Sequence, residues 1–173
     1  MAPGPSRADV GEGRNLTPVM LLDNPADLNR LLPAGARLLG LDVGSKTIGI
    51  ALSDGGRVVA TPYDTIRRTK FTKDAERLAS IVATEGVGGF VIGLPINMNG
   101  TEGPRCQSTR QFARNLLDRI NLPTAFWDER LSTVAVTRTL LDADASRKRR
   151  AAVVDKMAAA YILQGALDFL SRA

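Results

Sequence analysis

Short apolar blocks separated by turn residues begin at residue 37 and predict the strands of this chain. Arg37–Val43 and Thr47–Ser53 flank a tight Gly-Ser-Lys turn and predict a β-hairpin, and Val58–Ile66 predicts a third strand. Two later blocks, Phe90–Leu94 and Thr124–Trp127, are short and largely apolar, which is typical of strands in the middle of a sheet. The pattern therefore predicts five strands.

Longer segments between and after these blocks have apolar residues at helical spacing. In Phe71–Gly86, Leu78, Ile81 and Val82 recur on one helical face, and the closing glycine is a common helix terminator. The same reasoning predicts three further helices, over Thr101–Ile120, Ser132–Leu141 and Val153–Leu170. Three consecutive strands followed by alternating helices and strands predict an α/β fold, a mixed five-stranded sheet with helices on both faces.

The first 35 residues have a different character. Residues 1–18 contain three prolines, three glycines and few apolar side chains, which is typical of a disordered arm. Asn24–Leu32 predicts a short helix, with Asn24 as its cap and Pro25 in the first position. We therefore divide the chain into an N-terminal extension, residues 1–35, and one folded domain, residues 36–173.

The composition suits a single domain. The chain has 173 residues, of which 44% are hydrophobic and 24% charged, as in ordinary globular proteins. No apolar run approaches the roughly 20 residues of a membrane span, and no signal peptide is visible. The only cysteine, Cys106, excludes an internal disulfide and fits a reducing compartment. We expect a cytoplasmic protein without a membrane partner.

Histidine is absent, and this excludes several kinds of chemistry. The chain lacks the imidazole of Ser-His-Asp and Cys-His nucleophilic sites and of His-ligated zinc. One cysteine also excludes a structural zinc site. Catalysis at neutral pH would have to use carboxylates, lysine, tyrosine or a metal-bound water.

The net charge is +5, from 23 Lys and Arg against 18 Asp and Glu. The densest basic run is Arg147, Lys148, Arg149 and Arg150, with Lys156 shortly after it. A basic surplus fits a polyanionic partner such as nucleic acid. A solvated surface loop is the alternative for this run, and the composition leaves both open.

Acidic residues fall at positions where a site could form. Asp42 lies within the apolar strand Arg37–Val43, where a buried carboxylate is costly unless donors or a cation compensate its charge. Asp128 and Glu129 stand at the end of the last strand, and Asp155 is near the start of the terminal helix. Ligands of α/β sheets bind beyond the carboxyl ends of parallel strands, where these acids could meet.

Both a structural and a functional interpretation apply to these acids. Asp42 could pair with backbone donors or an arginine, and Asp155 could complement the helix dipole. Several carboxylates around one cavity, however, repel each other unless cations neutralise them. Mg²⁺ or Mn²⁺ prefers oxygen ligands, and two such ions can activate water against a phosphodiester.

The crossing Gly93–Arg105 is rich in glycine and leads into a predicted helix. A helix N-terminus can present backbone N–H groups to phosphate. The spacing is not that of a Walker A loop, and a connecting loop is the simpler interpretation.

Four motifs, in order, resemble the YqgF/RuvX family, and the resemblance covers roughly residues 36–170. They are Leu41–Asp54, the Gly93–Pro95 to Gly103–Pro104 crossing, Asp128–Thr133 and Val154–Ala159. The resemblance implies an RNase H-like fold, similar to the RuvC type of Holliday junction resolvase. It also implies a metal-dependent nuclease, a hydrolase that matures the 5′ end of the small-subunit (16S) ribosomal RNA precursor in ribosome biogenesis. The alternative is resolution of Holliday junctions in branched DNA.

By the same resemblance, Asp42, Glu129 and Asp155 correspond to the family's catalytic and metal-binding acids, with Mg²⁺ or Mn²⁺ as cofactor and Asp128 as a secondary candidate. In the resolvase relatives an acid ends the fourth strand, whereas here that strand is followed by Pro95-Ile96-Asn97, so Glu129 would have to reach over from the next strand. The expected contacts to nucleic acid are Lys46, Arg105, Arg130, Arg147, Lys148, Arg149, Arg150 and Lys156. A monomer and a homodimer are both compatible, and a non-enzymatic nucleic-acid-binding module is a further alternative.

Overall fold

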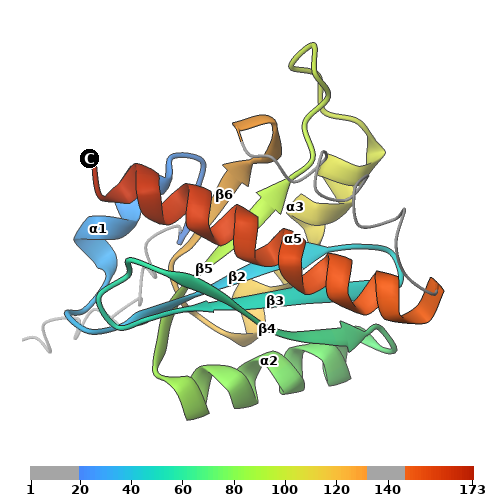
Figure 1. Ribbon diagram of the computed structural model, residues 1–173, viewed down its shortest axis with the longest axis horizontal. Coiled ribbons are helices and arrows are strands. Elements are labelled where there is room, and N and C mark those ends of the chain that lie inside the picture. The colour runs from blue at the N-terminus through green and yellow to red at the C-terminus, as the bar shows by residue number, and fades with distance from the viewer. Residues whose placement is uncertain (1–19, 132–146) are drawn as a thin grey trace, which may run out of the picture.

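The computed structural model describes residues 20–131 and 147–173, and these residues form one six-stranded sheet covered by helices (Figure 1). The strand order is β1-β6-β5-β2-β3-β4. The strands are β1 (Leu21–Leu22), β2 (Arg37–Val43), β3 (Thr47–Ser53), β4 (Ala60–Arg67), β5 (Val87–Leu94) and β6 (Thr124–Asp128). Strand β5 is parallel to β2 and β6, whereas β3 is antiparallel to β2 and β4. The predicted mixed α/β sheet is therefore confirmed.

Helices lie on both faces of this sheet. They are α1 (Leu28–Leu31), α2 (Phe71–Glu85), α3 (Pro104–Arg119) and α5 (Arg147–Leu170), with short 3₁₀ turns η1 (Pro25–Asp27) and η2 (Glu129–Leu131). Side chains of α2 and α3 pack on one face, and α5 crosses the other face (Figure 1). Local signals set these ends: Gly86 terminates α2 in the left-handed conformation, at φ 65°, and Pro104 occupies the first position of α3.

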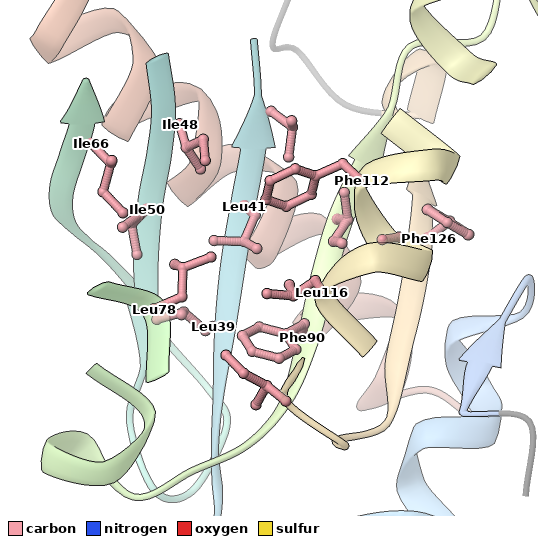
Figure 2. Packing of buried hydrophobic residues seen from close by; sticks show 14 of the residues in the cluster. Leu39, Leu41, Ile48, Ile50, Ile66, Leu78, Phe90, Phe112, Leu116 and Phe126 are labelled. Atoms are coloured by element: carbon pink, nitrogen blue, oxygen red, sulfur yellow. The ribbon is translucent and has the colours of Figure 1, made fainter. Parts of the chain in front are cut away.

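The core between the sheet and helices α2 and α3 consists of large apolar side chains. Leu39 and Leu41 of β2 and Phe90 of β5 pack with Leu78 of α2 and Leu116 of α3, and all five are buried (Figure 2). Because successive strand residues point to opposite faces, the even-numbered residues of β2 face α5.

Helix α5 lies close to the sheet. Leu38 of β2 packs with Ala159 and Leu163 of α5 in a second apolar cluster. A Cβ atom added to Gly40 would lie 2.7 Å from the Cβ of Leu163 and 3.0 Å from the carbonyl oxygen of Ala159. Small residues on both elements therefore let the backbone of α5 lie very close to β2.

The predicted strands, and the predicted helices within the described residues, are present, with two corrections. The sixth strand, β1, was missed because two residues carry no periodicity; it pairs in parallel with β6, with Leu21 opposite Thr124. Helix α5 begins at Arg147 and not at Val153, so the basic run is the start of a helix and not a loop. Arginine and lysine are good helix formers, but they give no apolar pattern from which a helix could be predicted. The helix predicted over Ser132–Leu141 lies outside the described residues.

The second half of the predicted extension is part of the packed fold. Besides β1, it contains the expected short helical segment, present as η1 and α1, in which the Asn24 side chain accepts a hydrogen bond from the Ala26 N–H at 3.0 Å. Leu28 is fully buried in the cluster below α5. Residues 20–35 therefore pack together with the sheet and α5 as part of the same folded unit.

Candidate active site

The carboxyl ends of three parallel strands meet at one edge of the sheet. Strands β2, β5 and β6 run in the same direction and end at Val43, Leu94 and Asp128. Asp42 is the next-to-last residue of β2, and Glu129 directly follows β6. Two of the three predicted catalytic acids therefore come from the same edge, at the place where α/β sheets bind ligands.

Asp42 points to the side of the sheet that α5 covers. It follows Leu38 and Gly40 at two-residue spacing, and both of these residues contact α5. Only 5% of its surface is exposed. A carboxylate in this position thus lies on the α5 side of the sheet, away from the apolar core of the opposite face.

Asp155 reaches the same side from α5. Strand β3 pairs Gly49 with Asp42, and a Cβ atom on Gly49 would overlap the backbone carbonyl of Asp155. The helix therefore passes directly over the position next to Asp42. Thr47 donates a hydrogen bond from its hydroxyl to the Asp155 carboxylate at 2.5 Å, which holds that side chain above the start of β3.

The position of Asp155 in the helix weakens its structural alternative. Because α5 begins at Arg147, Asp155 is more than two turns from the helix N-terminus. The favourable effect of an acid on the helix dipole is confined to the first turn. Asp155 is therefore not a dipole-compensating acid at the start of α5.

Glu129 lies on the other side of Asp42. Its Oε1 atom is 2.7 Å from the position that a Cβ atom on Gly93 of β5 would occupy, and Ile162 of α5 borders the same position. Gly93 follows Ile92, which pairs with Leu41, so it lies beside Asp42 in the sheet. Glu129 thus reaches over from the end of β6, as the sequence required, and glycine leaves the space for its carboxylate.

Three acids from three elements consequently share one face and one end of the sheet. Within the described residues, however, no three Asp, Glu, Cys or His side chains are close enough to hold a single metal ion. The structure brings the backbones of the predicted triad together, but does not draw their carboxylates into one ligand set.

Asp128 has a different environment. It accepts hydrogen bonds from the Arg130 side chain, at 2.7 Å from Nη2 and 3.0 Å from Nε, and another from the Arg130 backbone N–H at 3.0 Å. The hydrogen bonds from the Arg130 side chain lower the pKa of Asp128. This carboxylate closes the turn after β6 and is already occupied by an arginine.

A cleft of about 910 Å³ opens beside Asp155, around the β2–β3 turn. Its lining is made of basic, hydroxyl and small residues from the ends of several elements: Val43, Gly44, Ser45, Lys46, Thr47, Arg67, Arg68, Arg105, Ser108, Thr109 and Asp155. Asp42 and Glu129 are not among the lining residues. The cleft is thus adjacent to the acidic triad and not centred on it.

The predicted basic residues are divided among several places. Lys46 and Arg105 line the cleft, whereas Arg130 is paired with Asp128. Lys156 lies on α5 next to Asp155, and its backbone nitrogen is close to Gly49. Positions 147–150 form the first turn of α5, and their side chains lie outside the description.

Sequence reasoning missed several residues of this region. Thr47 was not considered, although its hydroxyl holds Asp155. Arg67 and Arg68, at the end of β4, face the cleft, and adjacent arginines directly after a predicted strand were an available signal. Gly49 and Gly93 were quoted only as parts of motifs, yet a glycine inside a strand often marks the close approach of another backbone or group.

An α/β domain that gathers acids at the carboxyl ends of its parallel strands, opposite a long covering helix, is of the RNase H-like class. The family model for RuvX, described as a Holliday junction resolvase, matches residues 36–169. The chain belongs to the RuvX family, as its motifs indicated.

Proteins of two bacteria are similar to this chain over most of their length. A protein of Paramagnetospirillum magneticum named "Putative pre-16S rRNA nuclease" is 69% identical over 144 residues, which cover 83% of this chain and 93% of that protein. A protein of the same name from Roseobacter denitrificans is 62% identical, with coverage of 86% and 93%. Among solved structures, Thermus thermophilus RuvC in complex with a Holliday junction substrate matches at a TM-score of 0.47 and 9% identity, covering 73% of this chain and 91% of RuvC.

No helix in the described part of the chain is long and apolar enough to cross a membrane. Helix α5, the longest of the described helices at 24 residues, contains several charged residues.

Proposed function

We propose that this chain is a metal-dependent nuclease that hydrolyses phosphodiester bonds in the precursor of 16S ribosomal RNA. The observation that carries the proposal is the meeting of Asp42, Glu129 and Asp155 on one face, at the carboxyl ends of parallel strands. Membership of the RuvX family and the names of its bacterial relatives support the same reaction. A pure binding module would not need three acids beside one another.

The proposed cofactor is Mg²⁺ or Mn²⁺, held by Asp42, Glu129 and Asp155. The donor chemistry fits, because hard divalent cations prefer carboxylate oxygens. Among the described residues, no three acidic side chains form a ligand set as they stand. When bound, such an ion lowers the pKa of water and stabilises negative charge on a leaving oxygen.

The protein's own contribution is positioning. Gly49 lets the backbone of α5 pass close to β3, Gly93 leaves space for the Glu129 carboxylate, and Thr47 orients Asp155. Burial of Asp42 limits the motion of its carboxylate. These contacts fix the directions from which the acids approach a phosphate.

Cleavage of branched DNA is the second candidate, and the description of the family favours it. A junction resolvase would be expected to act as a symmetric dimer making paired cuts, whereas rRNA processing is compatible with a monomer. We favour the RNA substrate because both reported relatives, at 69% and 62% identity, carry the name of an rRNA nuclease. Either activity would operate in the cytoplasm.

The deciding experiment gives the purified protein and Mg²⁺ two substrates, a precursor 16S rRNA and a four-way DNA junction. The Asp42→Asn variant should lose cleavage by roughly 100-fold or more, since even groups that only support a metal ligand cost 10–100-fold when removed. Asparagine has nearly the same shape, so circular dichroism should show an intact fold. Full activity of Asp42→Asn, or cleavage that persists in excess chelator, would contradict the mechanism.

A further inference from the structure

We propose that the cleft beside Asp155 binds the backbone phosphates of a single-stranded segment of the substrate, with Arg67 and Arg105 as its main contacts. The identity of the ligand as nucleic acid rests on the proposed nuclease function. The site itself rests on the shape and charge of the cleft. The proposal adds Arg67 to the predicted nucleic-acid contacts and gives the substrate strand a path toward the acids.

The cleft has a surplus of positive charge that is not neutralised within the protein. Of the described residues that line it, four are cationic and one, Asp155, is acidic. Lys46, Arg67 and Arg105 are exposed, and none of the three forms an ion pair with another residue of the described chain. Like charges that face one recess repel each other, so an anion between them would be stabilised.

Arg68 also lines the cleft, but its guanidinium is engaged by other residues of the protein, so the binding role is assigned to Arg67. The Arg68 guanidinium donates to the Gly44 carbonyl at 2.7 Å, lies 5.3 Å from the centre of the Phe112 ring and is 3.9 Å from Asp74. These contacts fix the β2–β3 turn to the α3 side of the sheet. Arg68 is therefore part of the wall of the cleft, while Arg67 is available to a ligand.

The opposite wall is the start of α3. Gly103, the N-cap residue, provides no side-chain hydrogen bond to the first turn, so the positive end of this 16-residue helix is uncapped. Arg105, in that turn, and Ser108, at the start of the next turn, line the cleft. The positive end of α3 and the Arg105 guanidinium thus both contribute positive potential at this wall. A helix N-terminus is a suitable partner for phosphate.

The lining favours phosphate recognition over base recognition. No aromatic residue occurs among the described residues that line the cleft, so these offer bases no ring on which to stack. A recess of about 910 Å³ is within the size of small-ligand pockets and admits one strand more readily than a duplex. Contacts of this type position a strand without reading its sequence.

The cleft also reaches Asp155, one of the three acids. Thr47 lines it and holds Asp155, which forms its rim. A strand whose phosphates lie between Arg67 and Arg105 would therefore continue past Asp155 toward Asp42. The proposal predicts that the substrate extends in single-stranded form beyond the bond that is cut.

The test measures binding apart from cleavage. Fluorescence anisotropy with a labelled single-stranded RNA in EDTA compares the native protein with the double variant Arg67→Gln/Arg105→Gln. We expect a loss of affinity of roughly 10- to 100-fold, and a plot of log affinity against log salt that is flatter by about 1.4, because each phosphate contact to a single strand contributes about 0.7. The control, Arg114→Gln/Arg119→Gln, removes the same charge from exposed positions of α3 outside the cleft and should bind almost as the native protein does.

Several results would overturn the proposal. An unchanged salt slope in the cleft variant, or an equal loss in the control, would assign binding to overall charge. If binding of a blunt duplex falls by the same factor in the cleft variant as binding of single-stranded RNA, the single-strand assignment is excluded. If inorganic phosphate or a mononucleotide binds as tightly as longer RNA does, the cleft is a small-anion site. If the cleft variant loses RNA binding while the native protein cuts neither substrate, the cleft stands and the nuclease proposal fails; the reverse pattern rejects only the cleft.

Discussion

At the scale of single residues, the two neighbouring acids after β6 have separate environments. Asp128 is bound by Arg130, and its pKa is lowered chiefly by the hydrogen bonds from that side chain. A lowered pKa in the folded state means that this contribution to stability is present at neutral pH and is lost as the pH falls through the folded pKa. Glu129 instead extends its carboxylate over Gly93.

This difference predicts unequal effects of two conservative substitutions. Glu129→Gln should lower cleavage by roughly 10- to 100-fold or more, while the melting temperature stays close to that of the native protein. Asp128→Asn should weaken the contact with Arg130 and cost about 1 kcal/mol or less, as partly exposed ion pairs do, with cleavage largely retained. Kinetic assays and thermal melts of the two variants separate these effects, and a larger catalytic loss in Asp128→Asn would reverse the assignment.

The residue types of the proposed site could be predicted from the sequence, but their supporting contacts could not. Asp42, Glu129 and Asp155 are identified by carboxylates at the ends of predicted elements and by family motifs. The hydrogen bond from Thr47 to Asp155 joins residues 108 positions apart. Such contacts depend on how a helix is placed over a sheet, which local patterns do not define.

At the scale of elements, the close packing of α5 on β3 depends on Gly49. A methyl group there would overlap the backbone carbonyl of Asp155, and neither backbone can move aside as a flexible side chain could. We expect Gly49→Ala to destabilise the fold by about 3 kcal/mol, the upper end for overpacked cores, and to displace Asp155. Denaturant unfolding measures this cost. Gly56→Ala is the matched control, since its nearest heavy atom would be a side-chain oxygen of Asp54 at 3.3 Å, and a similar loss there would contradict the argument.

The basic run at the start of α5 gives a second prediction at this scale. Replacing Arg147, Lys148, Arg149 and Arg150 with glutamine should weaken RNA binding for all sequences and flatten the dependence of log affinity on log salt. Helix stability should not fall, because positive charge in a first turn opposes the helix dipole and glutamine is a good helix former. Anisotropy titrations at several salt concentrations test the prediction. An unchanged slope would mean that these four side chains are solvated and do not contact the RNA.

The sequence predicted best those helices and strands in which apolar residues recur at a regular spacing. The hairpin Arg37–Val43 and Thr47–Ser53 has the bounds of β2 and β3, and α2 ends where Gly86 predicts. The two-residue strand β1 was missed because its existence depends on pairing with β6, which lies about 100 positions away. The early start of α5 was missed because periodicity follows apolar residues and this turn is basic.

At the scale of the whole molecule, the folded unit is larger than the segment that the family model matches. That match begins at residue 36, but β1 extends the sheet and Leu28 is fully buried under α5. The Met20 carbonyl also accepts a hydrogen bond from the Thr124 N–H at 2.6 Å. The residues just before the match therefore contribute to stability, although they carry no family motif.

Two truncations should consequently behave differently. Deletion of residues 1–19 should change the melting temperature and the metal-dependent cleavage little, because a segment of this composition has few apolar side chains to bury. Deletion of residues 1–35 exposes the edge of β6 and removes Leu28, and loss of one buried leucine alone costs about 2–5 kcal/mol. Thermal melts followed by circular dichroism compare the two proteins with the full chain. A large fall in melting temperature on removing only the first 19 residues would show that the arm packs on the domain, and near-native stability after removing 35 would show that β1 and α1 are dispensable.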